Sequence, residues 1–268
     1  MQQAKDFLEE AATLAKLLKN ESEGVFKKVT QFKSWTINDV IGHLHLFDIA
    51  AIKSLESDKA FLEFFEPISR DLKRGLSLLD VQFPYLKSLN GRELFNSWWE
   101  TANDLANKYL IADPKKRLKW AGPEMSAMSS ITARQMETWA HGQEIFDCLG
   151  VERVESDRIK NICHLGVATY PWTFKNRKLT IPKPAPYVQL VSPSGEVWSW
   201  NSPEAETFVI GNSIEFAQVV TQVRNVGDCS LNIYGENARN WMAMAQCFAG
   251  KPEDPPPKGS RYKVCFLR

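Results

Sequence analysis

Residues 133–150, ARQMETWAHGQEIFDCLG, have the pattern of a single helix that carries titratable side chains among apolar ones. Glu137 and His141 are four positions apart, so a helix places both side chains on one face, about one turn apart. Gly150 follows the last apolar positions and suits the C-terminal end of this helix. Two interpretations follow: the pair is part of a polar surface, or it provides two of the ligands of a metal ion.

A third candidate ligand lies in residues 34–57, SWTINDVIGHLHLFDIAAIKSLES. Thr36 and Asp39 form a variant of the capping box, which predicts that a helix begins here. His43 lies beside the apolar stripe of this helix, which consists of Val40, Leu44, Phe47 and Ala51. His45 is about 200° further around the helix, so we expect the two histidines to face different surroundings.

His43, Glu137 and His141 together make a set of two histidines and one carboxylate. Three protein ligands leave a coordination position open, as in catalytic zinc sites, and ferrous iron is bound by sets of the same composition. Judged by spacing alone, a Glu-x-x-x-His pair is common on solvated helices and a lone histidine is common in a core. The residues by themselves therefore leave both interpretations open, and His45 and His164 receive no functional role.

Helical periodicity dominates the first part of the chain. It predicts helices over residues 3–18, within 60–79 with an interruption or restart at Pro67, over 90–110 and over 151–177. Residues 113–130, DPKKRLKWAGPEMSAMSS, contain two prolines and a glycine and form a long connection before the helix of Glu137. This part is predicted to be an all-α domain covering residues 1–176.

The pattern changes after residue 177 to alternating apolar and polar positions. Residues 178–201 predict a β-hairpin that turns at Ser194 and Gly195. Strands are expected within 206–212 and 229–235, and helices over 213–223 and 236–250. Residues 251–260 are proline-rich and predicted to be irregular, before an apolar end in 262–267. The second domain, residues 177–268, is therefore predicted to be α+β.

Composition restricts the classes of partner. The 33 basic and 32 acidic side chains leave a net charge of +1, which provides no long-range attraction for nucleic acid or acidic lipid. No apolar run approaches the roughly 18 residues that a membrane span needs, and the N-terminus has no signal core, so we expect a cytoplasmic protein. The five scattered cysteines are expected to be reduced and unsuited to a zinc finger.

Three stretches resemble a known family. Residues 34–51, SWTINDVIGHLHLFDIAA, are similar to the W-T-v-x-D-v-x-x-H-L opening of the DinB-like, mycothiol-dependent maleylpyruvate isomerase family. Residues 120–150, WAGPEMSAMSSITARQMETWAHGQEIFDCLG, resemble its second motif, in the version of a metal-binding, wyosine-base-formation-like subgroup. Residues 195–250 resemble the C-terminal domain of that subgroup, so the resemblance covers nearly the whole chain.

The resemblance implies that His43, Glu137 and His141 are the metal ligands, with zinc as the expected metal. It also implies an N-terminal four-helix bundle with the metal at one end of its core and a C-terminal α+β domain similar to sterol-carrier folds. The implied activity is that of an isomerase or transferase in which a low-molecular-weight thiol, mycothiol or another, attacks a small electrophile as a thiolate. Glu144 stands where many relatives have Asp and is not assigned to the metal.

Three further residues are singled out. Arg224, in TQVRNVGD, resembles an arginine of the family's second domain and is predicted to hold a substrate carboxylate, with a solvated surface position as the alternative. Arg134 precedes Glu137 by one turn and either bonds that carboxylate or the bound ligand, or has a structural role. Cys148 is two turns beyond His141 and is interpreted as a small apolar residue.

Two alternative functions stay open beside thiol chemistry. Metal-bound water could hydrolyse or hydrate a substrate, or the protein could bind a metal and a small ligand without turnover. The expected partner in each case is a small molecule, and the chain is expected to be a monomer or a homodimer. The near-zero net charge disfavours RNA modification.

Overall fold

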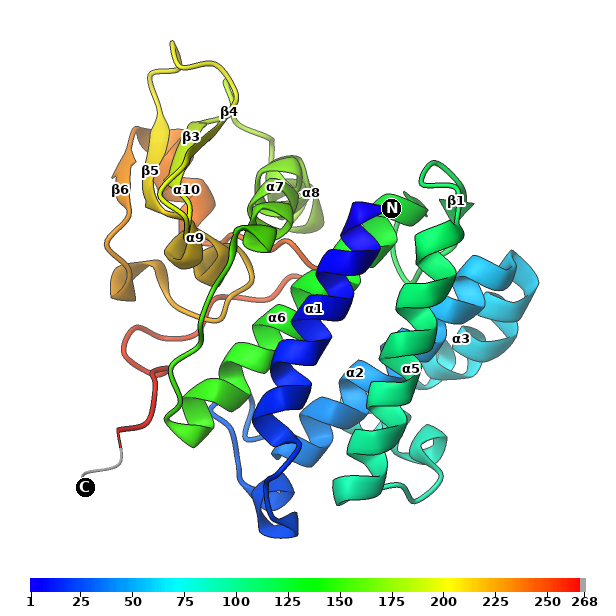
Figure 1. The fold of residues 1–268 in the computed structure, drawn as a ribbon. Helices are drawn as coiled ribbons and strands as arrows, with labels where there is room; N and C mark the ends of the chain where they lie inside the picture. The colour runs from blue at the N-terminus through cyan, green and yellow to red at the C-terminus, as the bar shows by residue number, and fades with distance from the viewer. Residues whose placement is uncertain (266–268) are drawn as a thin grey trace. The chain divides into compact units, whose positions relative to one another are not determined.

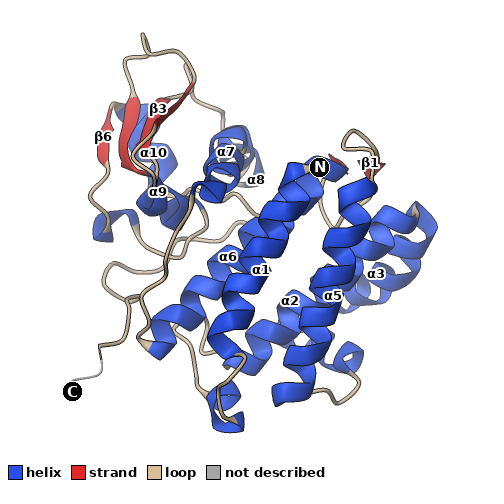
Figure 2. Ribbon diagram, in the orientation of Figure 1, coloured by secondary structure: helices blue, strands red, loops and turns tan. Residues whose placement is uncertain are grey.

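The structure is a computed structural model that describes residues 1–265 of the 268-residue chain (Figure 1). The chain divides into two compact units, Met1–Cys148 and a second unit that begins at Leu149. The first unit is mostly helical, and the second contains a four-stranded sheet (Figure 2). The predicted boundary after residue 176 lies later than this division, because the short helices after Leu149 pack within the second unit.

Four long helices form the framework of the first unit: α1 (Gln2–Leu18), α2 (Ile37–Glu56), α5 (Gly91–Ile111) and α6 (Ala127–Leu149). Helix α5 packs against both α1 and α2. The core of the first unit includes Trp98 and Trp139, whose side chains are fully buried. The shorter elements of this unit are η1 (Glu23–Lys27), α3 (Asp58–Lys73), α4 (Leu78–Gln82) and η2 (Phe83–Leu86). The helical character predicted for the N-terminal part is therefore confirmed.

The capping box at the start of α2 is present as predicted. The Asp39 amide donates to Thr36 Oγ1 at 3.1 Å, and the Thr36 amide donates to Asp39 Oδ2 at 2.9 Å. These bonds satisfy amide groups that the first turn of a helix leaves unpaired. Because the box determines where α2 begins, it also determines which face of the helix His43 occupies.

The prediction for residues 60–79 was wrong about the place where the helix is interrupted. Helix α3 continues through Pro67 without a break and ends at Lys73. Gly75 then has a φ of 95°, a conformation that favours glycine, and the chain begins again as α4. The connection predicted for residues 113–130 contains a short antiparallel pair, β1 (Arg117–Leu118) and β2 (Met125–Ser126), before α6 begins.

A buried ion pair joins α2 to α6. Arg134 Nε donates to Asp48 Oδ1 at 2.9 Å, and Arg134 Nη2 donates to the carbonyl of Leu44 at 3.3 Å. Both side chains of the pair are essentially inaccessible to solvent. Of the two roles predicted for Arg134, the structure shows the structural one: its guanidinium bonds α2 and not Glu137.

Two short helices begin the second unit. The single helix predicted over residues 151–177 was wrong, because an extended segment and η3 (Asp157–Ile159) precede α7 (Lys160–Ala168), and α8 (Tyr170–Asn176) follows as a separate helix. Pro171, in the first turn of α8, has no amide hydrogen and so begins a new helix. Helix α7 packs on α9 (Ser213–Val220), where Gly166 allows close approach: a Cβ there would lie 2.7 Å from Val220 Cγ2.

The sheet of the second unit is mixed, with strand order β4-β3-β5-β6. Its strands are β3 (Tyr187–Val191), β4 (Val197–Trp200), β5 (Phe208–Asn212) and β6 (Asn232–Tyr234). Strands β3 and β4 form the predicted hairpin, and Gly195 in its turn has a φ of 91°. Strand β5 runs parallel to β3 and antiparallel to β6. The α+β character of this region is confirmed, whereas its likeness to sterol-carrier folds stays a prediction.

The last predicted helix is shorter than expected. Helix α10 (Glu236–Met242) ends well before residue 250, and the proline-rich segment that follows is irregular, as predicted. Residues 266 and 267 of the predicted apolar end lie outside the described residues. Among residues 1–265, none of the helices combines the length and the apolar composition needed to cross a bilayer.

Replacing Arg134 should destabilise the first unit strongly. Arg134→Met leaves the buried Asp48 carboxylate unpaired, so we expect the free energy of unfolding to fall by about 3–5 kcal/mol. The double variant Arg134→Met/Asp48→Leu removes both charges and should recover much of that loss. The control is Lys108→Met, which breaks the exposed Lys108–Asp104 pair of α5 and should change stability by less than about 1 kcal/mol. Chemical denaturation measures the free energy of unfolding of the three variants. Equal stability of Arg134→Met and wild type would contradict the structural role of Arg134.

Candidate metal centre

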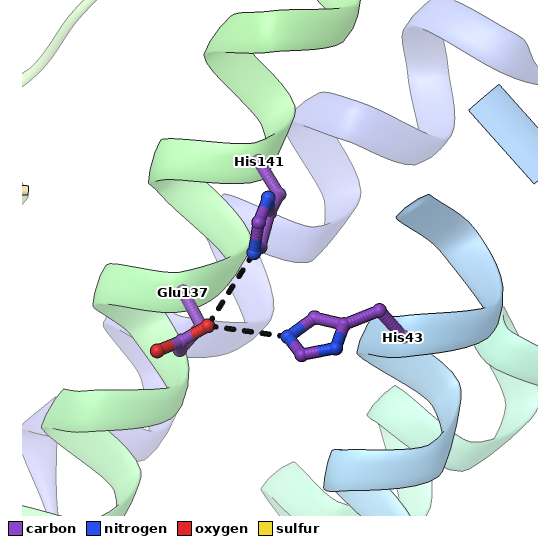
Figure 3. A group of neighbouring side chains, drawn as sticks. All are labelled: His43, Glu137 and His141. Carbon is purple, nitrogen blue, oxygen red and sulfur yellow. Dashed lines mark hydrogen bonds and ion pairs between the residues drawn. The ribbon is translucent and has the colours of Figure 1, made fainter. Parts of the chain in front are cut away.

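Three side chains from two helices of the first unit converge at one point (Figure 3). His43 projects from α2, and Glu137 and His141 project from consecutive turns of α6. One ligand atom from each lies within 4.8 Å of the other two. The structure thus brings together the three residues that the sequence predicted as ligands; that they bind a metal stays a prediction.

The distances within this cluster suit a cation better than direct hydrogen bonds. Glu137 Oε2 lies 3.4 Å from His43 Nε2 and 3.5 Å from His141 Nε2. Hydrogen bonds between nitrogen and oxygen are usually about 2.7–3.2 Å long. Two ligand atoms that each lie about 2.1 Å from a tetrahedrally coordinated zinc ion are about 3.4 Å apart. The spacing and the donor set therefore fit a divalent ion such as zinc.

Solvent reaches the cluster unevenly. The side chains of His43 and His141 are 8% and 11% exposed, whereas that of Glu137 is 24% exposed. The histidines are thus held within the helical packing, and the carboxylate lies at the more open side. Because three ligands do not complete a coordination sphere, a further ligand has room to bind only from such an open side.

Glu144 orients His141. Its Oε2 lies 3.0 Å from His141 Nδ1, so a neutral His141 donates the Nδ1 proton to Glu144 and directs the Nε2 lone pair toward Glu137. Two electron-rich atoms, His141 Nε2 and Glu137 Oε2, then face each other unless a proton or a metal ion lies between them. Sequence reasoning kept Glu144 out of the ligand set but missed this role, although its position one turn after His141 was visible.

The cluster and its flanking carboxylate favour one positive charge on His141. Burial opposes that charge, but the carboxylates of Glu144 and Glu137 raise the pKa of His141 to about 9. Burial lowers the pKa of His43 to about 4, against the opposing effect of Glu137. Burial acts to raise the pKa of Glu137, yet both histidines hold it well below its usual range. A divalent cation would replace the proton at His141 Nε2, since the same carboxylates attract it.

His43 lacks the outer partner that His141 has. Its Nδ1 is buried without a hydrogen-bond partner among the described residues. Rings surround it instead: Trp35 and Phe47 lie with ring centroids 5.6 and 4.7 Å from the imidazole. Packing, and not a second hydrogen bond, therefore fixes the orientation of this imidazole.

The other predicted residues are placed as follows. Arg134 pairs with Asp48, as described above. Cys148 is half-buried, its thiol donates to the carbonyl of Val29 at 3.4 Å, and burial raises its pKa, which fits the predicted role of a small packed residue. Arg224 lies just after α9 in the second unit, where its Nη1 donates to the carbonyl of Val223. Its contact with a substrate stays a prediction.

The helical unit and its His-Glu-His cluster are those of a candidate metal-binding protein, and comparison with known proteins identifies the family. A family model described as the mycothiol maleylpyruvate isomerase N-terminal domain matches residues 7–146. Uncharacterized proteins from two strains of Mycobacterium tuberculosis are 36% identical to this chain over 223 residues, which is 83% of this chain and 86% of theirs. The chain belongs to the mycothiol maleylpyruvate isomerase N-terminal domain family.

The fold also resembles solved structures. The crystal structure of the mycothiol-dependent maleylpyruvate isomerase, and that of a histidine-to-alanine mutant, match with a TM-score of 0.52 and 15% identity. The match covers 81% of this chain and 87% of those chains. At this level of identity the likeness concerns the fold alone, and the predicted wyosine-related subgroup stays a prediction.

Metal binding should release a proton. At pH 7, His141 is protonated because its pKa is about 9, whereas His43 is neutral because its pKa is about 4. Binding of zinc should therefore release about one proton, and its affinity should rise about tenfold per pH unit between pH 6 and 8. Calorimetric titrations in buffers of different ionisation enthalpy measure both quantities.

Glu144→Gln provides the matched variant for this prediction. Loss of that charge lowers the pKa of His141, so fewer protons should be released at pH 7 than in the wild type. His164→Ala, a change in the second unit, should leave both quantities unchanged. An affinity for zinc that is independent of pH in this range would show that zinc displaces no proton from His141, which contradicts the prediction.

Proposed function

We propose that this protein is a metal-dependent enzyme that uses a low-molecular-weight thiol to isomerise a small electrophilic substrate or to transfer a group to or from it. The observation that carries the proposal is the convergence of His43, Glu137 and His141 within 4.8 Å in a member of this family. The likeness in fold to the mycothiol-dependent maleylpyruvate isomerase supports it. Mycothiol or another thiol is the proposed cofactor, and zinc is the proposed metal.

The donor set accounts for the choice of metal. Two imidazole nitrogens and one carboxylate oxygen are the usual ligands of catalytic zinc, and ferrous iron is the alternative for the same set. When bound, the cation supplies positive charge that lowers the pKa of a nearby thiol, so that a thiolate is available at neutral pH.

The residues around the cluster prepare it for this role. Glu144 keeps the Nδ1 proton of His141 in place, which leaves Nε2 free for a cation. Phe32 and Trp35 cover the imidazoles from the loop before α2, with ring centroids 5.0 Å from His141 and 5.6 Å from His43. Their packing limits access of water to the histidines, while the carboxylate of Glu137 stays more open.

Finer features of the architecture and the partners belong to the same proposal. We propose that the helical unit is a four-helix bundle of the DinB type and that the second unit is related to sterol-carrier folds. A small molecule is the proposed partner, with no role for nucleic acid or membrane, which agrees with a net charge of +1.

Substitution of the ligands tests the proposal. His43→Ala and His141→Ala each remove one of three protein ligands, so zinc content and thiol-dependent turnover should fall together, each at least tenfold. His164→Ala is the matched control and should keep both. The assay measures zinc in the purified protein and thiol-dependent isomerisation of α,β-unsaturated carbonyl compounds, with mycothiol and other cellular thiols in parallel.

The outcomes separate the alternatives. Full zinc occupancy in His141→Ala would remove the site assignment. A zinc-loaded wild type that is inert with every thiol but hydrolyses or hydrates a substrate would favour hydrolase or hydratase chemistry. A zinc-loaded wild type without turnover of any kind would favour a binding protein.

Arg224 has its own test. If it holds a substrate carboxylate, Arg224→Gln should raise KM for carboxylate-bearing substrates about tenfold or more and leave zinc content unchanged, because a charge-assisted hydrogen bond is lost. Substrates without a carboxylate provide the control and should be unaffected. An unchanged KM for both kinds of substrate would leave Arg224 as a surface residue.

A further inference from the structure

A row of aromatic rings leads from the metal cluster to helix α3. The ring of Phe47 on α2 lies 4.7 Å from that of His43. Trp120, in the loop between β1 and β2, lies 6.3 Å beyond Phe47, and Phe61 stacks on it at 5.7 Å. Phe65 stacks in turn on Phe61 at 5.3 Å. Phe47, Trp120, Phe61 and Phe65 are called the aromatic row below.

The row keeps part of its surface accessible. Phe47, Trp120 and Phe65 are half-buried, whereas Phe61, on which Trp120 and Phe65 stack, is only 2% exposed. These three half-buried rings therefore keep part of a large apolar area in contact with solvent. Accessible rings next to a candidate metal site therefore provide a surface on which a flat apolar molecule can stack.

Two members of the row also pack outside it, whereas the ring contacts of Trp120 are with other members of the row. Phe47 and Phe65 also pack against a small core formed by Leu46, Ile68 and Val81, together with other partly buried residues that include Tyr85. Trp120 is not a member of that core, and its rings contact Phe47 and Phe61 of the row.

Two hydrogen bonds hold the segment next to Trp120. Ser54 Oγ donates to the carbonyl of Lys119 at 2.5 Å, and Lys116 Nζ donates to the carbonyl of Leu55 at 2.5 Å. The loop of Trp120 is thus fixed to the last turns of α2, the helix that also carries His43. A ring carried on a fixed segment loses less conformational entropy when a ligand stacks on it.

Arg134, in the helix that carries two of the candidate ligands, is already paired with other groups of the protein. Arg134 is the cation on the same helix as Glu137 and His141, and its guanidinium is occupied by Asp48 and the carbonyl of Leu44. Apart from Glu137 and Glu144, the side chains that lie against the imidazoles are aromatic: Phe32, Trp35 and Phe47.

We infer that the aromatic row binds the body of the substrate, and that the substrate is an α,β-unsaturated carbonyl compound with an aryl or other flat apolar substituent. The inference rests on the proposed function and names its substrate class. In that reaction the thiolate sulfur bonds to the β-carbon, and the electron pair of the double bond moves to the carbonyl oxygen. Reversal after rotation restores the thiolate and yields the isomer.

A pair of chelators tests the subsite without any turnover. Acetohydroxamate and benzohydroxamate carry the same metal-binding group and differ in a methyl against a phenyl group. Titration calorimetry with the zinc-loaded full chain should show benzohydroxamate binding about tenfold more tightly. Trp120→Leu should reduce that preference to about threefold or less, and Trp120→Phe, which keeps a ring, should retain most of it.

Tyr85→Leu is the matched control, because Tyr85 is also a partly buried aromatic residue but stands outside the row. It should keep the wild-type preference. Equal binding of both chelators to the wild type, an unchanged preference in Trp120→Leu, or an equal loss in Tyr85→Leu overturns the inference. A chain that holds no zinc, or a zinc-loaded chain that binds neither chelator, overturns it as well.

The two proposals can fail separately. A zinc-loaded chain that shows the phenyl preference but no thiol chemistry supports the subsite and overturns the thiol-dependent function. A chain that isomerises methyl- and aryl-substituted substrates equally well with a thiol supports the function and overturns the subsite.

Discussion

The buried contact between Arg134 and Asp48 is the constraint on which the candidate site depends. It joins α2 to α6, and these two helices carry all three candidate ligands. Asp48 follows His43 by five residues, and Arg134 precedes Glu137 by three, so the ion pair fixes the helices close to the ligand positions. A shift of one helix along the other would break a bond that is costly to lose inside a protein. The same bond that stabilises the helical unit therefore holds the imidazoles and the carboxylate within reach of one ion.

Local signals in the sequence were sufficient to predict the start of α2 and the shared helical face of Glu137 and His141. The capping box of Thr36 and Asp39 uses groups three residues apart, and Glu137 and His141 share a helical face because of their spacing, so both could be predicted without knowledge of the fold. The pairing of Arg134 could not, because Asp48 is 86 residues away and only the packing of α2 against α6 decides between it and Glu137. The aromatic row was missed for the same reason, since Trp120 meets Phe61 across two separate segments.

Elsewhere in the chain, local sequence patterns predicted a turn correctly but not every helix end. The hairpin turn at Gly195 follows from local turn residues, and it was predicted correctly. Pro67 was expected to interrupt a helix but lies within α3, whereas Pro171 begins one, so a proline's effect depends on its place in the helix. Sequence periodicity also extended the last helix beyond Met242, where the chain leaves the helix although apolar residues continue.

The central claim is that two imidazoles and one carboxylate hold a metal ion at the point where α2 and α6 meet. X-ray absorption spectroscopy of the zinc-loaded protein tests it most directly, because the method reports the identity and distance of the ligand atoms. The account predicts two imidazole nitrogens and a carboxylate oxygen at about 2.0–2.2 Å, with one imidazole contribution lost in a metal-loaded His43→Ala sample. A spectrum with sulfur ligands, or one that His43→Ala leaves unchanged, would contradict it.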